Sequence, residues 1–198
     1  MDVIQKAMEF ARKIFEGDSG GHDLDHTIRV YRMAVRLAEA EGADTQITAL
    51  AALLHDVDDR KISSETCETL DHARDFLHSH GVDGETTNRI LCIISQVSFS
   101  GGKVPESLEG KCVQDADRLD AMGAVGIART FAYGGSKGRR IHDPAGEDKT
   151  TSVQHFYDKL LKLEKLMNTE TGREMARQRH LFMEAFLHRF YGELDGIC

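Results

Sequence analysis

The most informative stretch of this sequence reads Ile47-Thr48-Ala49-Leu50-Ala51-Ala52-Leu53-Leu54-His55-Asp56-Val57. Only Thr48, His55 and Asp56 interrupt it, so a helix over these residues is apolar on nearly every side. Such a helix belongs at the centre of a helical protein, because each face needs an apolar partner. His55 and Asp56 are then expected at the carboxyl end of a buried helix. A carboxylate beside an imidazole in an apolar core requires a compensating cation or partner.

Helical periodicity continues along the rest of the chain. A first helix is expected to end near Gly17, with an apolar face formed by Ile4, Met8, Ala11 and Phe15. Further helices are expected over residues 23–42, 64–80, 83–98, 111–133, 151–166 and 170–193, with polar loops at 99–110 and 134–150. There is no convincing strand pattern, internal repeat or domain linker. The sequence therefore predicts a single all-α domain over residues 1–198.

Two more polar residues are expected on inward or partly apolar faces. His26 shares one face of its helix with Val30, Met33 and Leu37. Asp117 lies in the segment Gln114-Asp115-Ala116-Asp117-Arg118-Leu119-Asp120. Asp115 and Asp120 are interpreted as solvated charges, and Asp115 is turned away from the face that Asp117 and Asp120 share. Asp117 fits that interpretation less well, because the sequence after it becomes apolar.

The four residues His26, His55, Asp56 and Asp117 stand at spacings that suit a metal site built from separate helices. Imidazole nitrogen and carboxylate oxygen together suit Mn, Fe, Co, Ni or Zn, and an incomplete shell leaves positions for water and phosphate. A lone buried histidine such as His26 is more often a satisfied core residue than a ligand, and it is the adjacent His55-Asp56 pair that favours a metal. The metal-binding core is expected over about residues 22–133, with the C-terminal helices 151–193 packing on it.

Composition narrows the class of protein. A net charge of −8 argues against a general nucleic-acid binder, which needs a basic face. The four cysteines show no paired spacing, which favours a reduced, cytosolic setting, and Cys92 and Cys112 lie in apolar stretches typical of small core residues. The start of the chain lacks the apolar core of a signal peptide, and no stretch is long enough to span a bilayer.

The order His26, His55-Asp56, Asp117 resembles the HD-domain superfamily of metal-dependent phosphohydrolases, an all-α fold. The motifs that carry the resemblance are residues 21–30 (GHDLDHTIRV), 53–61 (LLHDVDDRK) and 114–126, with 159–163 (KLLKL), and they suggest a small stand-alone subgroup of predicted hydrolases. The resemblance implies that the four residues bind one divalent metal, whether Mn, Co, Ni, Mg, Fe or Zn. It also implies a proton-transfer role for Asp59, whose alternative is a solvated carboxylate at a helix end.

Two other branches of the superfamily match less well. The Gly-Tyr-Pro signature of cyclic-dinucleotide enzymes is missing. The dinuclear site of HD oxygenases needs further histidines, and His72, His78 and His80 are expected on the surface at spacings that do not converge. A dinuclear-iron oxygenase is therefore a weaker alternative.

A phosphohydrolase with a net negative charge must gather cations locally. Candidates near the proposed ligands are Arg29, Arg60, Lys61 and Arg118. Arginine suits this task because its guanidinium binds phosphate oxygens in pairs, although Arg118 could instead pair with Asp115 or Asp120. Weaker candidates are Lys137, Arg139 and Arg140, in a loop that is solvated or folds over an anion, and Lys159 and Lys162.

The function predicted from these residues is hydrolysis of a phosphate ester or anhydride, with a nucleotide as the expected substrate. Release of phosphate by a nucleotidase and release of pyrophosphate by a pyrophosphohydrolase both fit. The expected partner is a small phosphorylated substrate, with no stable nucleic-acid binding and no membrane. The alternative from another class is a non-catalytic helical module for nucleotide sensing or protein interaction that keeps the metal only for structure.

Overall fold

The computed structural model describes residues 2–16, 24–59, 65–97 and 103–197, and in these ranges the regular structure is entirely helical. The chain divides into two compact units, residues 1–117 and 118–198. The all-α prediction is confirmed. The expected packing of the C-terminal helices on the metal-binding core stays a prediction. Within the described residues no helix combines the length and apolar character needed to cross a bilayer.

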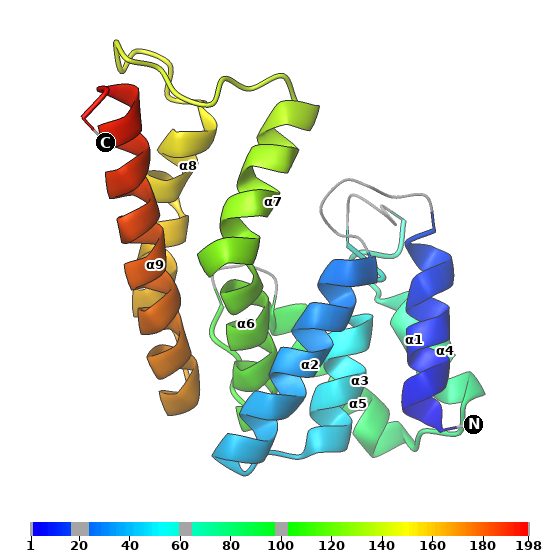
Figure 1. Cartoon of the computed structure of the whole chain (residues 1–198). Coiled ribbons are helices and arrows are strands. Elements are labelled where there is room, and N and C mark those ends of the chain that lie inside the picture. The colour runs from blue at the N-terminus through cyan, green and yellow to red at the C-terminus, as the bar shows by residue number, and fades with distance from the viewer. Residues whose placement is uncertain (1, 17–23, 60–64, 98–102, 198) are drawn as a thin grey trace. The chain divides into compact units, whose positions relative to one another are not determined.

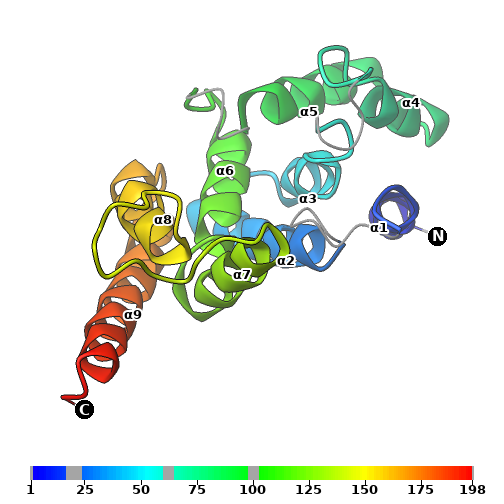
Figure 2. The same cartoon turned by 90° about the horizontal axis from the view of Figure 1, so that it is seen from above.

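The first unit contains α1 (Val3–Ile14), α2 (Leu24–Glu41), α3 (Thr45–Leu54), α4 (Asp71–Ser79), α5 (Gly84–Val97) and most of α6 (Leu108–Asp120). Helix α3 is at its centre and contacts α1, α2 and α5 (Figures 1 and 2). Every residue from Ile47 to Leu54 is buried, as its apolar surface requires. The carboxylate of Asp44 caps α3 by accepting hydrogen bonds from the backbone N–H groups of Gln46 and Ile47.

The second unit contains the end of α6, then α7 (Gly123–Ser136), α8 (Ser152–Asp158), the 3₁₀ helix η2 (Leu160–Leu166) and α9 (Glu170–Leu194). Its core includes an aromatic cluster in which the ring of Phe131 lies within 6.4 Å, between ring centroids, of Phe156, Phe186 and Phe190. Helices α7, α8 and α9 supply these rings.

Three expected helices differ in the structure. Residues 111–133 do not form one helix, because the chain breaks at Ala121 and Met122 and restarts at Gly123, whose φ of +69° suits glycine. The helix expected over 151–166 is split into α8 and η2. In the segment 64–80, residues 65–70 form turns and α4 begins only at Asp71.

Three burial predictions were wrong. Asp115 and Asp120 were expected in solvent, but both are buried, and Asp120 pairs with Arg129 at 2.5 Å. A carboxylate can be buried when tertiary partners compensate its charge, and sequence spacing does not reveal those partners. Cys92 is exposed, whereas Cys112 is buried as expected.

Candidate functional site

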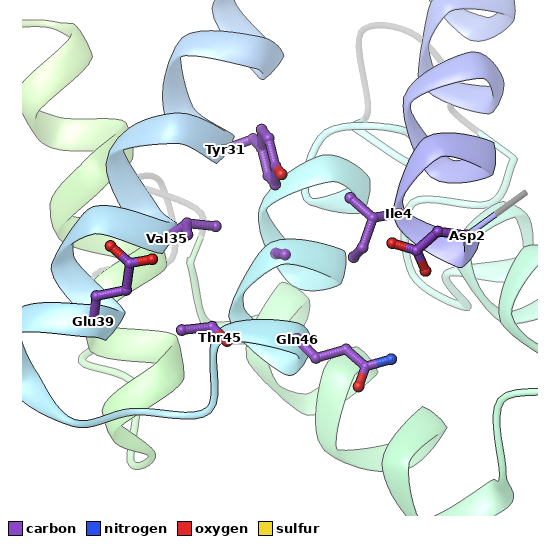
Figure 3. Close-up of a pocket in the computed structure, with 8 residues that line it drawn as sticks. Asp2, Ile4, Tyr31, Val35, Glu39, Thr45 and Gln46 are labelled. Atoms are coloured by element: carbon purple, nitrogen blue, oxygen red, sulfur yellow. The ribbon is translucent and has the colours of Figure 1, made fainter.

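A shallow pocket of about 390 Å³ lies among α1, α2 and α3 (Figure 3). Its lining comprises Asp2, Ile4, Tyr31, Val35, Glu39, Thr45, Gln46 and Ala49. None of the described candidate residues lines it, and its two ionisable acids, Asp2 and Glu39, disfavour an anionic ligand. The pocket is therefore not the predicted phosphate site.

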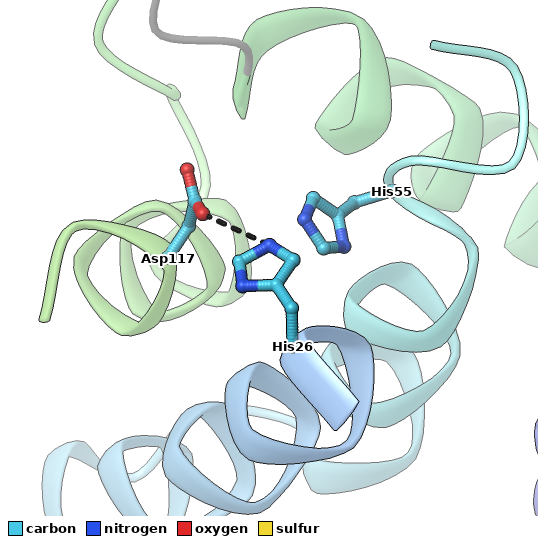
Figure 4. Close-up of side chains that lie close together, drawn as sticks. All are labelled: His26, His55 and Asp117. Carbon is cyan, nitrogen blue, oxygen red and sulfur yellow. Dashed lines mark ion pairs between the residues drawn. The ribbon is translucent and has the colours of Figure 1, made fainter. Parts of the chain in front are cut away.

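The predicted metal-binding residues come together elsewhere in the first unit. His26, in the first turn of α2, is almost completely buried and points towards the end of α3 and towards α6 (Figure 4). Its Nε2 atom lies 3.4 Å from Oδ2 of Asp56 and 3.5 Å from Oδ1 of Asp117. Asp117, near the end of α6, keeps 28% of its side chain exposed. The cluster is therefore accessible to solvent through Asp117, as a site that admits substrate needs.

His55 caps the carboxyl end of α3, and its ring is oriented by the backbone. Its Nδ1 lies 2.8 Å from the carbonyl oxygen of Ala52, so Nδ1 is the donor and Nε2 is left to act as a ligand. Nε2 is buried and has no hydrogen-bond partner among the described residues, although Oδ2 of Asp56 lies 3.2 Å away. A buried polar atom without a partner is costly, and a cation would satisfy it.

The spacing of the donor atoms fits a metal. Two ligand atoms about 2.1 Å from one ion lie ~3 Å apart when adjacent and ~4.2 Å apart when opposite. One ligand atom each from His26, His55 and Asp117 can be chosen so that all lie within 4.8 Å of one another. Asp56 adds an oxygen within 3.4 Å of both imidazoles. The residues therefore fit the divalent metal that HD domains bind.

The electrostatics of the cluster favour a positive charge at its centre. Burial by itself lowers the pKa of His55, but the adjacent carboxylate of Asp56, helped by that of Asp117, raises this pKa to about 9. The metal-free site therefore favours a proton on His55 near neutral pH, which offsets the two carboxylates. A divalent cation would replace that proton.

The predicted catalytic and phosphate-binding residues are less completely described. Asp59 follows the cluster directly, with its backbone N–H donating to the carbonyl of Asp56 at 3.0 Å. Arg29 lies one helical turn after His26 on α2 and is half-buried. Arg60 and Lys61 lie outside the described residues. Their substrate roles stay predictions.

The remaining cations belong to the second unit. The guanidinium of Arg118 donates a hydrogen bond to the backbone carbonyl of Leu166, so its phosphate role also stays a prediction. Lys137 and Arg139 lie over the ring of Tyr133, and Arg140 pairs with Asp143 at 2.8 Å. These three loop cations are exposed. Lys159 is half-buried and Lys162 is exposed.

Sequence reasoning missed Asp58. Its side chain is only 1% exposed and lies 3.1 Å from Nδ1 of His72, whose own side chain is 40% exposed, as expected of a surface residue. His78 and His80 are exposed, as expected. The sequence held one signal, since Asp58 follows the buried helix in a run of acids. Nothing in that run distinguishes Asp58 from Asp59.

Comparisons with known proteins agree with this geometry. The HD domain family model matches residues 23–122. The Bacillus subtilis protein YpgQ is 41% identical over 192 residues, which cover 95% of this chain and 92% of YpgQ. A crystal structure of an HD-superfamily hydrolase from Bacillus thuringiensis is similar with a TM-score of 0.81 and 44% identity, covering 97% of this chain and 96% of that one.

The crystal structure of B. subtilis YpgQ in complex with ADP is similar with a TM-score of 0.82 and 36% identity, covering 98% of this chain and 100% of that one. The resemblance identified from the motifs is thus confirmed by a family model and by relatives that extend along nearly the whole chain. The chain belongs to the HD domain family.

Proposed function

We propose that this protein is a metal-dependent phosphohydrolase that acts on a phosphate ester or anhydride of a nucleotide. The observation that carries the proposal is the convergence of His26, His55, Asp56 and Asp117, in which His55 presents a buried Nε2 without a hydrogen-bond partner among the described residues. Such a site binds a divalent cation and keeps coordination positions for oxygen ligands.

The relatives support the same class of reaction and ligand. The B. thuringiensis structure is described as an HD-superfamily hydrolase, and YpgQ was crystallised with ADP. ADP carries both a phosphate ester and a phosphate anhydride. A nucleotide with one or more phosphates is therefore the substrate class we propose for this chain.

In this proposal the four residues bind the metal, Asp59 accepts a proton and Arg29 binds phosphate. The metal, when bound, supplies positive charge and Lewis acidity at a phosphoryl oxygen. The Asp59 carboxylate accepts the proton of the attacking water, a role for which its position directly after the Asp56 turn is suitable. Arg29 binds a phosphate oxygen through its guanidinium.

The test is a screen of the purified, metal-stripped protein against nucleoside mono-, di- and triphosphates, with Mn, Co, Ni and Mg supplied separately. Release of phosphate or pyrophosphate only in the presence of a metal, and its loss in Asp56→Ala, is expected. Identification of the product separates nucleotidase from pyrophosphohydrolase activity. If metal and ADP bind but no nucleotide is hydrolysed, the protein is a sensing module and the proposal fails. Two irons per chain would indicate the dinuclear oxygenase.

A further inference from the structure

Asp58 forms a buried link between the His55-Asp56 turn and helix α4. Its Oδ1 accepts a hydrogen bond from the backbone N–H of His72 at 3.2 Å, and its Oδ2 accepts one from the backbone N–H of Ala73 at 3.0 Å. Nδ1 of His72 lies 3.1 Å from the same Oδ1. Both carboxylate oxygens of Asp58 therefore accept hydrogen bonds from the first turn of α4.

Helix α4 depends on this remote carboxylate because it has no cap of its own. The residue at its N-cap position is Leu70, whose φ of 56° is left-handed and whose side chain makes no capping hydrogen bond. The first N–H groups of a helix need acceptors, and negative charge is favourable there. Asp58 supplies both acceptor oxygens from 14 and 15 residues earlier in the chain.

Hydrogen bonds consequently connect the turn over residues 55–59 to α3 on one side and to α4 on the other. On one side, His55 bonds through Nδ1 to the Ala52 carbonyl, and the N–H of Val57 donates to the Leu54 carbonyl at 3.3 Å. On the other side, Asp58 is fastened to α4. The Asp56 carboxylate lies between these two attachments, and Asp59 follows Asp58 directly, with its N–H closing the turn on the Asp56 carbonyl.

We propose that Asp58 is a positioning residue that sets the orientation of the Asp56 carboxylate in the metal site and of Asp59 beside it. This rests on the proposed function, in which Asp56 is a ligand and Asp59 the proton acceptor. Asp58 acts through the backbone of the turn. Without its hydrogen bonds to α4, the turn loses its attachment to that helix, and Asp56 samples orientations that do not converge with the two imidazoles.

The test compares four variants of the full chain. Asp58→Ala removes both acceptors, and Asp58→Asn retains one carbonyl acceptor. His72→Ala removes the imidazole but keeps the backbone N–H of residue 72. Asp71→Ala is the matched control, because Asp71 is an exposed carboxylate in the same first turn of α4.

Mn²⁺ affinity, measured by isothermal titration without substrate, is the first readout. Loss of a residue that orients a ligand typically weakens metal binding about 10–100-fold. We expect a loss of about 10-fold or more in Asp58→Ala, a smaller loss in Asp58→Asn, and no change in Asp71→Ala. His72→Ala should resemble wild type, since the two backbone hydrogen bonds remain.

Amide hydrogen exchange of the metal-free proteins is the second readout and is independent of metal and substrate. If Asp58 positions the turn, its loss should accelerate exchange at Val57 and Asp59 as well as in α4. If Asp58 only caps α4, exchange should accelerate over residues 71–79 alone. That pattern, or unchanged Mn²⁺ affinity in Asp58→Ala, would overturn the proposal. In either case hydrolysis by the wild-type protein would still support the proposed function.

The two proposals fail separately. A wild-type protein that hydrolyses no nucleotide, but shows the expected exchange at Val57 and Asp59 after Asp58→Ala, loses the proposed function and keeps the positioning role. If the Asp58→Ala variant does not fold, the same two measurements on Asp58→Asn test the positioning role. Exchange at Val57 and Asp59 equal to wild type in that variant, together with unchanged Mn²⁺ affinity, counts against the role.

Discussion

Nε2 of His55 lies 3.2 Å from Oδ2 of Asp56, the residue that directly follows it in the chain. Two adjacent side chains usually diverge, but here the first ends a helix and the second begins a turn, so both point to the same place. The Ala52 carbonyl accepts a hydrogen bond from Nδ1 of His55 and so orients the imidazole ring. Their convergence is the local reason that we propose this pair as two ligands of one metal.

The metal content of single-residue variants tests the ligand set. His26→Ala and Asp117→Ala should each lower metal content well below one ion per chain and abolish hydrolysis, because each removes a donor atom that converges with the other three. Elemental analysis after dialysis measures this. His78→Ala, which removes an exposed histidine of α4, is the control. Full occupancy in either ligand variant would exclude that residue from the site.

Asp59 should be separable from metal binding. We expect Asp59→Asn to keep one metal and the wild-type melting temperature but to lose about 10²–10⁴-fold in kcat, the usual contribution of a general acid or base. Steady-state kinetics with the preferred nucleotide measures this loss, and Asp75→Asn on α4 is an exposed control. Near-normal turnover would identify Asp59 as a solvated carboxylate.

Arg29 should matter more for longer phosphate chains. A charged hydrogen bond contributes about 1.5–3 kcal/mol, so Arg29→Ala should reduce kcat/KM for triphosphates by roughly 10–150-fold and for monophosphates by less. The matched control is Arg32→Ala, an exposed arginine one turn further along α2. Equal losses on both substrates would point to a pocket that binds a single phosphate.

The affinity for metal should increase with pH. The pKa of His55 is raised to about 9, so below that pH a metal must displace a proton, and affinity should rise about tenfold per pH unit from neutral pH to about 9. The same proton stabilises the metal-free fold. That contribution is complete below pH 6.5, the unfolded value, and is lost as pH rises through about 9. Titration calorimetry and thermal unfolding at several pH values measure the two effects, and pH-independent affinity would contradict them.

Stability of the second unit should depend on Gly126. A Cβ at this position would overlap the backbone carbonyl of Ala121, which cannot move independently of the helix break, so Gly126→Ala should destabilise by about 1–3 kcal/mol. Gly135→Ala, in the same helix with open space around it, should instead stabilise by roughly 0.5–1 kcal/mol. Urea unfolding measures both. Equal effects of the two changes would show that the overlap is relieved by backbone movement.

Local patterns in the sequence determined the central helix and the candidate metal-site residues. Residues 47–54 had to be buried because they offer no polar face, and His55 and Asp56 had to follow at the end of that helix. His26 could be placed inward from the apolar residues that share its face of α2, and it is buried. These inferences hold because a helix has a fixed period, so sequence spacing predicts direction.

Only the tertiary structure decided which carboxylate side chains are buried. Asp58 and Asp59 are neighbours of the same type, yet Asp58 accepts two hydrogen bonds from the start of α4 and is buried, whereas Asp59 is half-buried. Asp115 has a charged side chain in a helix, yet it is completely buried. Whether a carboxylate is solvated or buried depends on partners distant in sequence, because those partners determine whether the cost of desolvating its charge is offset.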